Sequence, residues 1–207
     1  LSTLEKRLML AGEVGAAAPV DASCAAEVSC DAATLGSANS AQSSHLVIID
    51  AGAVIDGALA ESVPEHAEIV VLDAGQDGIE QISALLASRQ SLQSVHLLSH
   101  GSSAKLQLGN ATLSAENLDR YAASIAQWGK SMQAGGDLLL YGCNVAETQS
   151  GKDFVRKLST LTGVDVAAST DRTGSASNGL GDWELEFHQG VIGHSQLLAA
   201  ETLNQFQ

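Results

Sequence analysis

The chain has 207 residues, of which 45% are hydrophobic, so it is long enough for one α/β domain with a buried core and some additional tail. Its formal net charge of −14, from 24 acidic and 10 basic residues, argues against nucleic acid and anionic membrane surfaces as partners. No apolar run approaches the roughly 18 residues that a membrane helix needs, so we expect no membrane insertion.

The first 44 residues are expected to form a largely irregular leader or linker. From residue 11 to 44 the sequence is rich in Ala, Ser, Gly and Asp and has almost no large apolar side chains. Cys24 and Cys30 lie in this segment, and they would either close a small disulfide loop in an exported protein or remain free thiols. Because the sequence opens at Leu1, we also expect it to be a piece of a longer polypeptide.

The folded domain is predicted to span residues 45–192, followed by a C-terminal tail at 193–207. Short apolar runs bounded by turn residues predict buried strands, and helical periodicity predicts the elements between them. The expected strands are 45–50, 68–73, 94–99, 137–142 and 164–168, with helices at 77–89, 114–128 and 150–162. A hairpin is expected at 105–113 and a half-exposed strand at 183–187. This order predicts an α/β fold with a doubly wound, mostly parallel sheet flanked by helices.

Two of these strands end in residues that carry chemistry. One apolar run stops at His100-Gly101, and another stops at Gly142-Cys143. Because neighbouring parallel strands deliver their last residues to one edge of the sheet, we expect the imidazole and the thiol to meet there as a nucleophile and its proton acceptor. The alternative interpretation is that Cys143 is a small core residue and that His100 belongs to a turn.

Acyl transfer also needs donors for the negative charge that develops on the substrate oxygen. Glycine after His100 lets a substrate carbonyl approach the backbone closely, so the Gly101 N–H is one expected donor. The Cys143 N–H is the natural second donor. A helix that begins near residue 150 behind this edge would add positive potential near the sulfur.

A hydrophobic block ending in His-Gly, followed by a second block ending in Cys, resembles the caspase-like (clan CD) cysteine peptidases. Over about residues 44 to 192 the chain more closely resembles the bacterial domain of unknown function DUF4347. The motifs that carry this resemblance are Leu97-Leu98-Ser99-His100-Gly101, Leu106-Gln107-Leu108-Gly109, Leu139-Leu140-Tyr141-Gly142-Cys143, Val166-Ala167-Ala168-Ser169-Thr170-Asp171 and Gly181-Asp182-Trp183-Glu184-Leu185-Glu186. The resemblance implies a caspase-like three-layer sandwich, within a large secreted or surface-located, adhesin-like bacterial protein.

The same resemblance implies a cysteine endopeptidase in which His100 is the general base and acid and Cys143 is the nucleophile. The expected substrate is a polypeptide, either the parent chain itself or a neighbouring chain. Asp50 and Asp171 lie at the same sheet edge and are candidates for an acidic pocket that binds an Arg or Lys side chain of the substrate. The alternative is that Asp50 caps a turn and Asp171 forms an Asx-turn. The rival function is a non-catalytic module of the same fold that binds proteins during secretion or surface assembly.

A cysteine–histidine dyad implies no cofactor, and we expect no metal in the catalytic step. The histidines lack the spacing that builds a zinc site. Calcium is considered at Asp73, Gln76 and Asp77, where Gly75 and Gly78 allow turns, although the twelve-residue calcium loop is absent.

Overall fold

The computed structural model describes residues 9–10, 43–53, 67–174 and 181–194. Within them, one sheet has the strand order β1-β3-β2-β4-β8-β9-β10. Every neighbouring pair is parallel except β9 and β10, which are antiparallel. The strands are β1 (Met9–Leu10), β2 (His45–Ile49), β3 (Ala67–Val71), β4 (Leu92–Leu98), β8 (Met132–Tyr141), β9 (Asp165–Ala168) and β10 (Phe187–Gln189). The predicted α/β fold with a mostly parallel central sheet is therefore confirmed.

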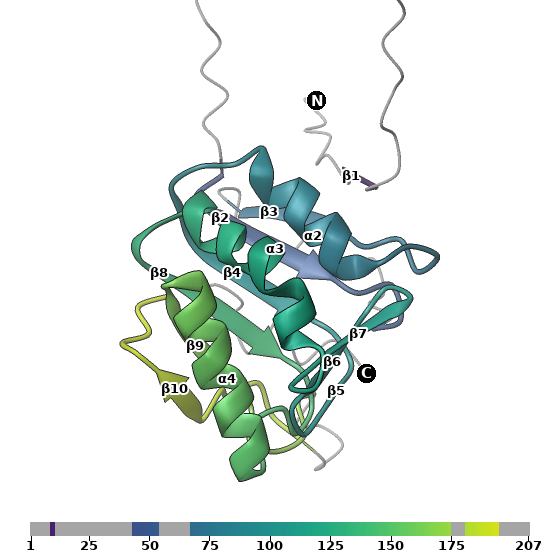
Figure 1. The fold of residues 1–207 in the computed structure, drawn as a ribbon, viewed down its shortest axis with the longest axis vertical. Helices are drawn as coiled ribbons and strands as arrows, with labels where there is room; N and C mark the ends of the chain where they lie inside the picture. Colours follow the sequence, from purple (N-terminus) through teal and green to yellow (C-terminus); the bar gives the residue numbers. More distant parts are fainter. Residues whose placement is uncertain (1–8, 11–42, 54–66, 175–180, 195–207) are drawn as a thin grey trace, which may run out of the picture.

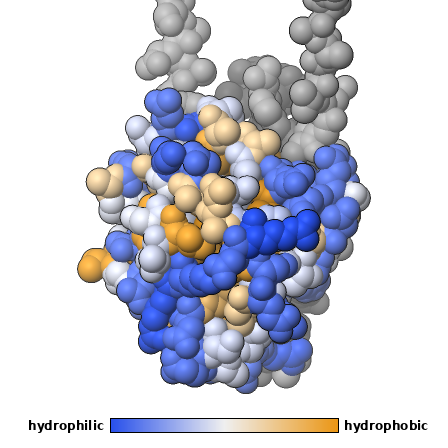
Figure 2. All heavy atoms as spheres, in the orientation of Figure 1, coloured by the Kyte–Doolittle hydropathy of each residue, from blue (hydrophilic) through white to orange (hydrophobic). Residues whose placement is uncertain are grey.

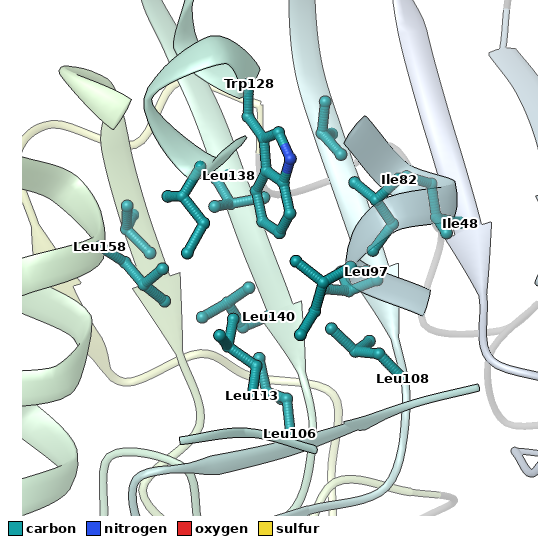
Figure 3. Packing of buried hydrophobic residues seen from close by; sticks show 14 of the residues in the cluster. Ile48, Ile82, Leu97, Leu106, Leu108, Leu113, Trp128, Leu138, Leu140 and Leu158 are labelled. Carbon is teal, nitrogen blue, oxygen red and sulfur yellow. The ribbon is translucent and has the colours of Figure 1, made fainter. Parts of the chain in front are cut away.

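Three helices cover one face of this sheet (Figure 1). They are α2 (Gly78–Ala87), α3 (Ala122–Trp128) and α4 (Gln149–Thr162). Their apolar side chains interdigitate with those of β2, β4 and β8 in the main core (Figure 3). The core residues labelled there are Ile48, Ile82, Leu97, Leu106, Leu108, Leu113, Trp128, Leu138, Leu140 and Leu158. On the outside, this face is mostly hydrophilic, with a patch of apolar surface near its middle (Figure 2).

The opposite face of the sheet carries a smaller apolar cluster. It contains Val47, Ile49, Leu98, Leu139, Tyr141 and Ala167 from the strands. Leu185 completes it, with Trp183 and Ile192 packed against it. In the part of the chain that the structure describes, this face is therefore covered by the segment 183–192 rather than by a helix.

Local signals explain where the helices begin and end. Asp77 caps α2, because its carboxylate accepts the Ile79 N–H at 2.8 Å and the Glu80 N–H at 3.2 Å. Thr148 caps α4 by accepting the Gly151 N–H. At the other end of α4, Gly163 adopts a left-handed conformation with a φ of 73°, which glycine reaches without steric cost. None of the described helices is both long and apolar enough to cross a membrane.

A small antiparallel sheet stands at the edge where β4 ends. It consists of β5 (Gly101–Ser102), β6 (Lys105–Leu108) and β7 (Ala111–Ser114), in that order. The predicted hairpin is thus confirmed, with Gly109 and Asn110 at its turn. Because β5 starts at Gly101, this sheet fixes the backbone directly after His100.

Three predicted elements differ from the structure. The strand expected at 137–142 begins five residues earlier, at Met132. The helix expected from residue 114 begins later, because Ser114 still pairs in β7 and a 3₁₀ turn, η1 (Leu118–Tyr121), precedes α3. A second 3₁₀ turn, η2 (Gly129–Ser131), follows it. The strand expected at 183–187 is wrong over most of its length, since β10 begins only at Phe187. The alternating pattern there arises because Leu185 turns inward from a loop while the carboxylate of Glu186 accepts the Thr170 N–H.

Residues on both sides of the expected domain, 45–192, also contact it. Within the leader, β1 pairs in parallel with β3, through Met9 with Val70 and Leu10 with Val71. In the expected tail, the backbone N–H groups of Gly193 and His194 donate to the buried carboxylate of Asp137 at 2.9 and 2.8 Å. The rest of the leader up to residue 42 and of the tail from residue 195 lies outside the described residues, as do Cys24 and Cys30.

Candidate active site

The register of the central sheet brings His100 and Cys143 to the same edge from adjacent strands. Leu98 of β4 pairs in parallel with Tyr141 of β8. The Ser99 N–H then donates to the Tyr141 carbonyl oxygen at 3.1 Å, which continues the pairing beyond β4. His100 and Cys143 each lie two residues after the last pair. They therefore leave the sheet side by side at its carboxyl edge.

Two glycines allow the backbones at this point to approach each other. A Cβ atom on Gly101 would lie 2.8 Å from Val145 Cγ2, 2.9 Å from the Gly142 carbonyl carbon and 3.0 Å from the Cys143 carbonyl oxygen. A Cβ atom on Gly142 would lie 3.3 Å from the Gly101 Cα. The His100-Gly101 and Gly142-Cys143 segments are thus in direct van der Waals contact, and any side chain at residue 101 would push them apart.

The His100 ring is oriented by a backbone carbonyl group. Its Nε2 lies 2.9 Å from the Gly52 carbonyl oxygen, in the loop that follows β2. Because a carbonyl oxygen only accepts hydrogen bonds, Nε2 carries a proton, and in the neutral ring Nδ1 is the acceptor nitrogen. Nδ1 makes no hydrogen bond with any described residue. The imidazole is exposed, so a substrate can reach it.

The Cys143 thiol lies against the loop that follows β9. It is partly exposed, and its Sγ donates to the Thr173 carbonyl oxygen at 3.5 Å. The next residue, Asn144, has a φ of 61°, a left-handed conformation that is uncommon outside glycine. The Asn144 N–H donates to the Asp171 carbonyl oxygen at 2.5 Å, so the turn after the cysteine is tied to the same loop.

The two expected oxyanion donors, the N–H groups of Gly101 and Cys143, have no hydrogen-bond partner among the described residues. Gly101 and Leu106 face each other in the β5–β6 pair, and the Gln107 N–H donates to the His100 carbonyl oxygen at 2.9 Å. In this antiparallel pattern Gly101 occupies a non-hydrogen-bonded position, so its N–H points away from β6. The Cys143 N–H makes no hydrogen bond among the described residues. Among the described residues, the backbone therefore has two N–H donors without a partner where the two strands end.

Asp50 lies at the same edge, but its carboxylate is almost fully enclosed. The residue is 1% exposed. Its Oδ2 accepts the Gly52 N–H at 3.0 Å, and its Oδ1 accepts the Gly109 N–H at 2.6 Å. This geometry matches the turn-capping alternative rather than an open acidic pocket.

Asp171 lies on the surface, next to two other acidic side chains. Asp171, Asp182 and Glu186 each offer one carboxylate oxygen as a possible metal ligand. These three oxygens lie within 4.8 Å of one another. Partial burial first, and then the charges of Glu186 and Asp182, raise the pKa of Asp171 above its usual value. This acidic trio could hold a cation or a basic side chain of a substrate. Asp50 is not part of it.

The residues considered for calcium from the sequence have other partners. Asp73 Oδ1 accepts the Gly75 N–H and Oδ2 accepts the Gln76 side-chain amide, which are the bonds of a tight turn. These bonds lower the pKa of Asp73. Asp77 caps α2, and its second oxygen accepts the Tyr121 hydroxyl. Both carboxylates therefore stabilise local structure.

Sequence reasoning did not identify the groups that hold the dyad. The Gly52 and Thr173 carbonyl groups come from loops that follow β2 and β9, and every residue type carries such a group. Only Gly52 gave a weak signal, as a glycine two residues after an aspartate at a strand end.

Known proteins provide one informative match. The family model of DUF4347, a domain of unknown function, matches residues 46–207. No curated protein matches the chain. A solved structure titled as a small-chain dehydrogenase is similar at a TM-score of 0.32 and 9% identity, over 57% of this chain and 76% of that chain. A likeness this weak carries no argument about function. Since the family model covers most of the sequence, the chain belongs to the DUF4347 family, as its motifs predicted.

Proposed function

We propose that this domain is a caspase-like cysteine endopeptidase that uses a Cys143–His100 dyad. The observation that carries the proposal is the parallel β4–β8 register, which delivers both residues to one edge with Gly101 packed on the Gly142-Cys143 backbone. The exposure of His100 and the partial exposure of Cys143 also support it, because a catalytic pair must be reachable.

In the proposed reaction, His100 Nδ1 accepts the thiol proton and the Cys143 sulfur attacks the carbonyl carbon of a peptide bond. The negative charge on the substrate oxygen is stabilised by the N–H groups of Gly101 and Cys143. When the tetrahedral intermediate collapses, the C–N bond breaks and the imidazolium gives its proton to the leaving amine. Water, deprotonated by His100, then hydrolyses the thioester and releases the acid.

The loops around the dyad have roles in this scheme. The Gly52 carbonyl keeps the proton on Nε2, so Nδ1 is the basic nitrogen. The thiol proton must leave the Thr173 carbonyl oxygen and pass to Nδ1 in this scheme. The substrate we propose is a polypeptide, the parent chain of a secreted or surface-located bacterial protein. This choice rests on the family resemblance.

The test uses the full chain and three variants. Cys143→Ala and His100→Ala should each abolish cleavage of the chain or of a peptide library, measured by mass spectrometry over days. Ser102→Ala is the matched control, because Ser102 is exposed and lies two residues after His100 at the same edge. It should retain wild-type cleavage. Equal cleavage by the wild type and both dyad variants would refute the proposal.

The rival function is a non-catalytic binding module, and one contact favours it. The thiol donates to Thr173 rather than to His100. Iodoacetamide separates the two functions, because an activated thiolate alkylates much faster than an ordinary thiol. The peptidase predicts that Cys143 reacts faster than Cys24 and Cys30 and that His100→Ala removes this advantage. A slow Cys143 that is indifferent to His100→Ala supports the binding module.

The proposed chemistry requires no cofactor, since the dyad supplies both the nucleophile and the base. A cation bound by the trio of Asp171, Asp182 and Glu186 would be calcium rather than zinc, because all three offer hard oxygen ligands. Asp171 is also tied to the turn after the nucleophile through Asn144, so such an ion would act on the loop beside the thiol. A calcium titration of the melting temperature, compared between the wild type and Asp182→Asn, decides whether calcium binds there.

A further inference from the structure

Asp50 is a buried carboxylate that the proposed reaction does not use. It directly follows β2, is 1% exposed and accepts two hydrogen bonds, both from backbone N–H groups of glycine residues. No described Lys or Arg forms an ion pair with it. Burying a carboxylate costs free energy unless hydrogen bonds compensate for the lost water. These two bonds are therefore strong constraints on the loops that donate them.

The first of these loops leads to the His100 ring. Asp50 Oδ2 holds the Gly52 N–H at 3.0 Å, and the carbonyl group of the same glycine accepts the proton of His100 Nε2 at 2.9 Å. Packing is tight, since a Cβ on Gly52 would lie 2.9 Å from Asp50 Oδ2 and 3.8 Å from His100 Cδ2. The carboxylate thus fixes the peptide group before the Gly52 Cα. The ring rests on the next peptide group, whose Ala53 N–H donates to the Asp50 main-chain oxygen at 2.9 Å.

The second loop leads to the His100 backbone. Asp50 Oδ1 holds the Gly109 N–H at 2.6 Å, at the turn between β6 and β7. Gly109 has a φ of 58° and no room for a side chain, so this turn has a single geometry. From the same hairpin, the Gln107 N–H donates to the His100 carbonyl oxygen at 2.9 Å. One carboxylate therefore anchors both segments that hold His100, one at its ring and one at its main chain.

We propose that Asp50 is a positioning residue for His100, which holds the Gly52 carbonyl so that Nε2 keeps its proton and Nδ1 faces the reaction as the base. This inference deepens the proposed function and rests on it for its catalytic meaning. It replaces the role of Asp50 in a pocket for a basic substrate side chain, because both carboxylate oxygens are already bonded and the residue is enclosed.

The test compares Asp50→Ala with Asp50→Asn and a matched control. The alanine removes both acceptors, whereas the asparagine leaves at least one of the two N–H groups facing an NH₂ group. The control is Asp137→Ala, since Asp137 is 0% exposed and also accepts backbone N–H bonds, but lies in the middle of β8, opposite Ser94 of β4 and away from the dyad. If Asp50→Ala does not fold, Asp50→Asn carries the comparison.

The first measurement is the ring ¹⁵N chemical shifts of His100 in alkaline solution, where the imidazole is neutral. The wild type and Asp137→Ala should contain the single tautomer protonated at Nε2, while Asp50→Ala should contain a mixture. This readout needs no enzymatic activity. An unchanged tautomer in Asp50→Ala would overturn the inference even if the domain is a peptidase, and a wild type that cleaves nothing would overturn the peptidase alone.

The second measurement separates positioning from substrate binding. Asp50→Asn should lower kcat and the alkylation rate of Cys143 at least tenfold, with KM unchanged for Arg and Lys peptides. Asp137→Ala should stay within twofold of the wild type in both rates. A selective rise in KM for basic peptides, with kcat intact, would assign Asp50 to the substrate pocket and refute the positioning role.

Discussion

His96 should make the folded domain sensitive to acid. Its side chain is 0% exposed in β4, and burial first, then the charges of His45 and His194, lowers its pKa from 6.5 to about 3. Ser94 Oγ lies 2.9 Å from Nε2, but Nδ1 is buried without a hydrogen-bond partner. The folded protein therefore keeps this imidazole neutral over the whole range in which an unfolded chain takes up a proton.

The sign and size of the effect follow from that difference. Between pH 6.5 and about 3 the unfolded state binds one more proton at this site, so stability falls as the pH falls. The slope approaches about 1.4 kcal/mol per pH unit, which amounts to about 2 kcal/mol between pH 7 and pH 5. Paired carboxylates add their own loss at lower pH, so the window above pH 5 isolates the histidine best.

The substitution His96→Phe tests this reasoning. A phenyl ring keeps the stacked contact with Tyr141, whose ring centroid lies 5.8 Å away, and Ser94 Oγ keeps its 2.8 Å contact with His45 Nδ1. It also removes the buried unpaired nitrogen. The free energy of unfolding from urea titrations should drop by about 2 kcal/mol less between pH 7 and pH 5 in the variant than in the wild type.

Any packing cost of the phenyl ring is the same at both pH values, so it cancels in this comparison. Equal pH dependence in the wild type and His96→Phe would refute the reasoning, because it would mean that the buried imidazole titrates in the folded protein as it does in the unfolded chain.

Further predictions concern glycine positions and the core. Gly101→Ala should cost about 1–3 kcal/mol of stability, because its Cβ would overlap Val145 and the Gly142 backbone. The same overlap should separate His100 from Cys143, so the alkylation rate of Cys143 should fall. Gly136→Ala, in the first half of β8, is the control that is also overpacked, with contacts of 3.1–3.3 Å. The alkylation rate of Cys143 in this variant should match the wild type. Gly163→Ala should cost about 1 kcal/mol in a thermal melt, since its φ of 73° is strained for alanine, and an unchanged melting temperature would contradict the assigned cap. Phe154→Ala should cost about 3–5 kcal/mol in urea unfolding, because α4 buries this ring against the sheet, and a loss below 1 kcal/mol would contradict that packing.

Most of the sheet could be predicted because buried parallel strands appear in the sequence as short apolar runs. Runs such as His45–Ile49 and the last residues of β8 are apolar on both faces and stop at small or polar residues. The strand predicted at 183–187 was wrong because a loop there has the pattern of a half-exposed strand. Its alternation of polar and apolar residues is produced by a loop that buries Leu185 on the second face of the sheet, and a local pattern cannot distinguish a covering loop from a strand.

The sequence by itself determined the α/β class, the family and the two residues proposed as the dyad, because strand ends and reactive side chains can be read locally. Only the tertiary structure decided what surrounds that dyad. The Gly52 carbonyl reaches His100 across 48 residues, and the Thr173 carbonyl reaches Cys143 across 30. Every residue type has a backbone carbonyl group, so no sequence pattern could predict which carbonyl groups contact the dyad. The same holds for Asp50, whose place at a strand end suggested an acidic pocket. In the structure it is buried, and its two carboxylate oxygens accept the N–H groups of Gly52 and Gly109.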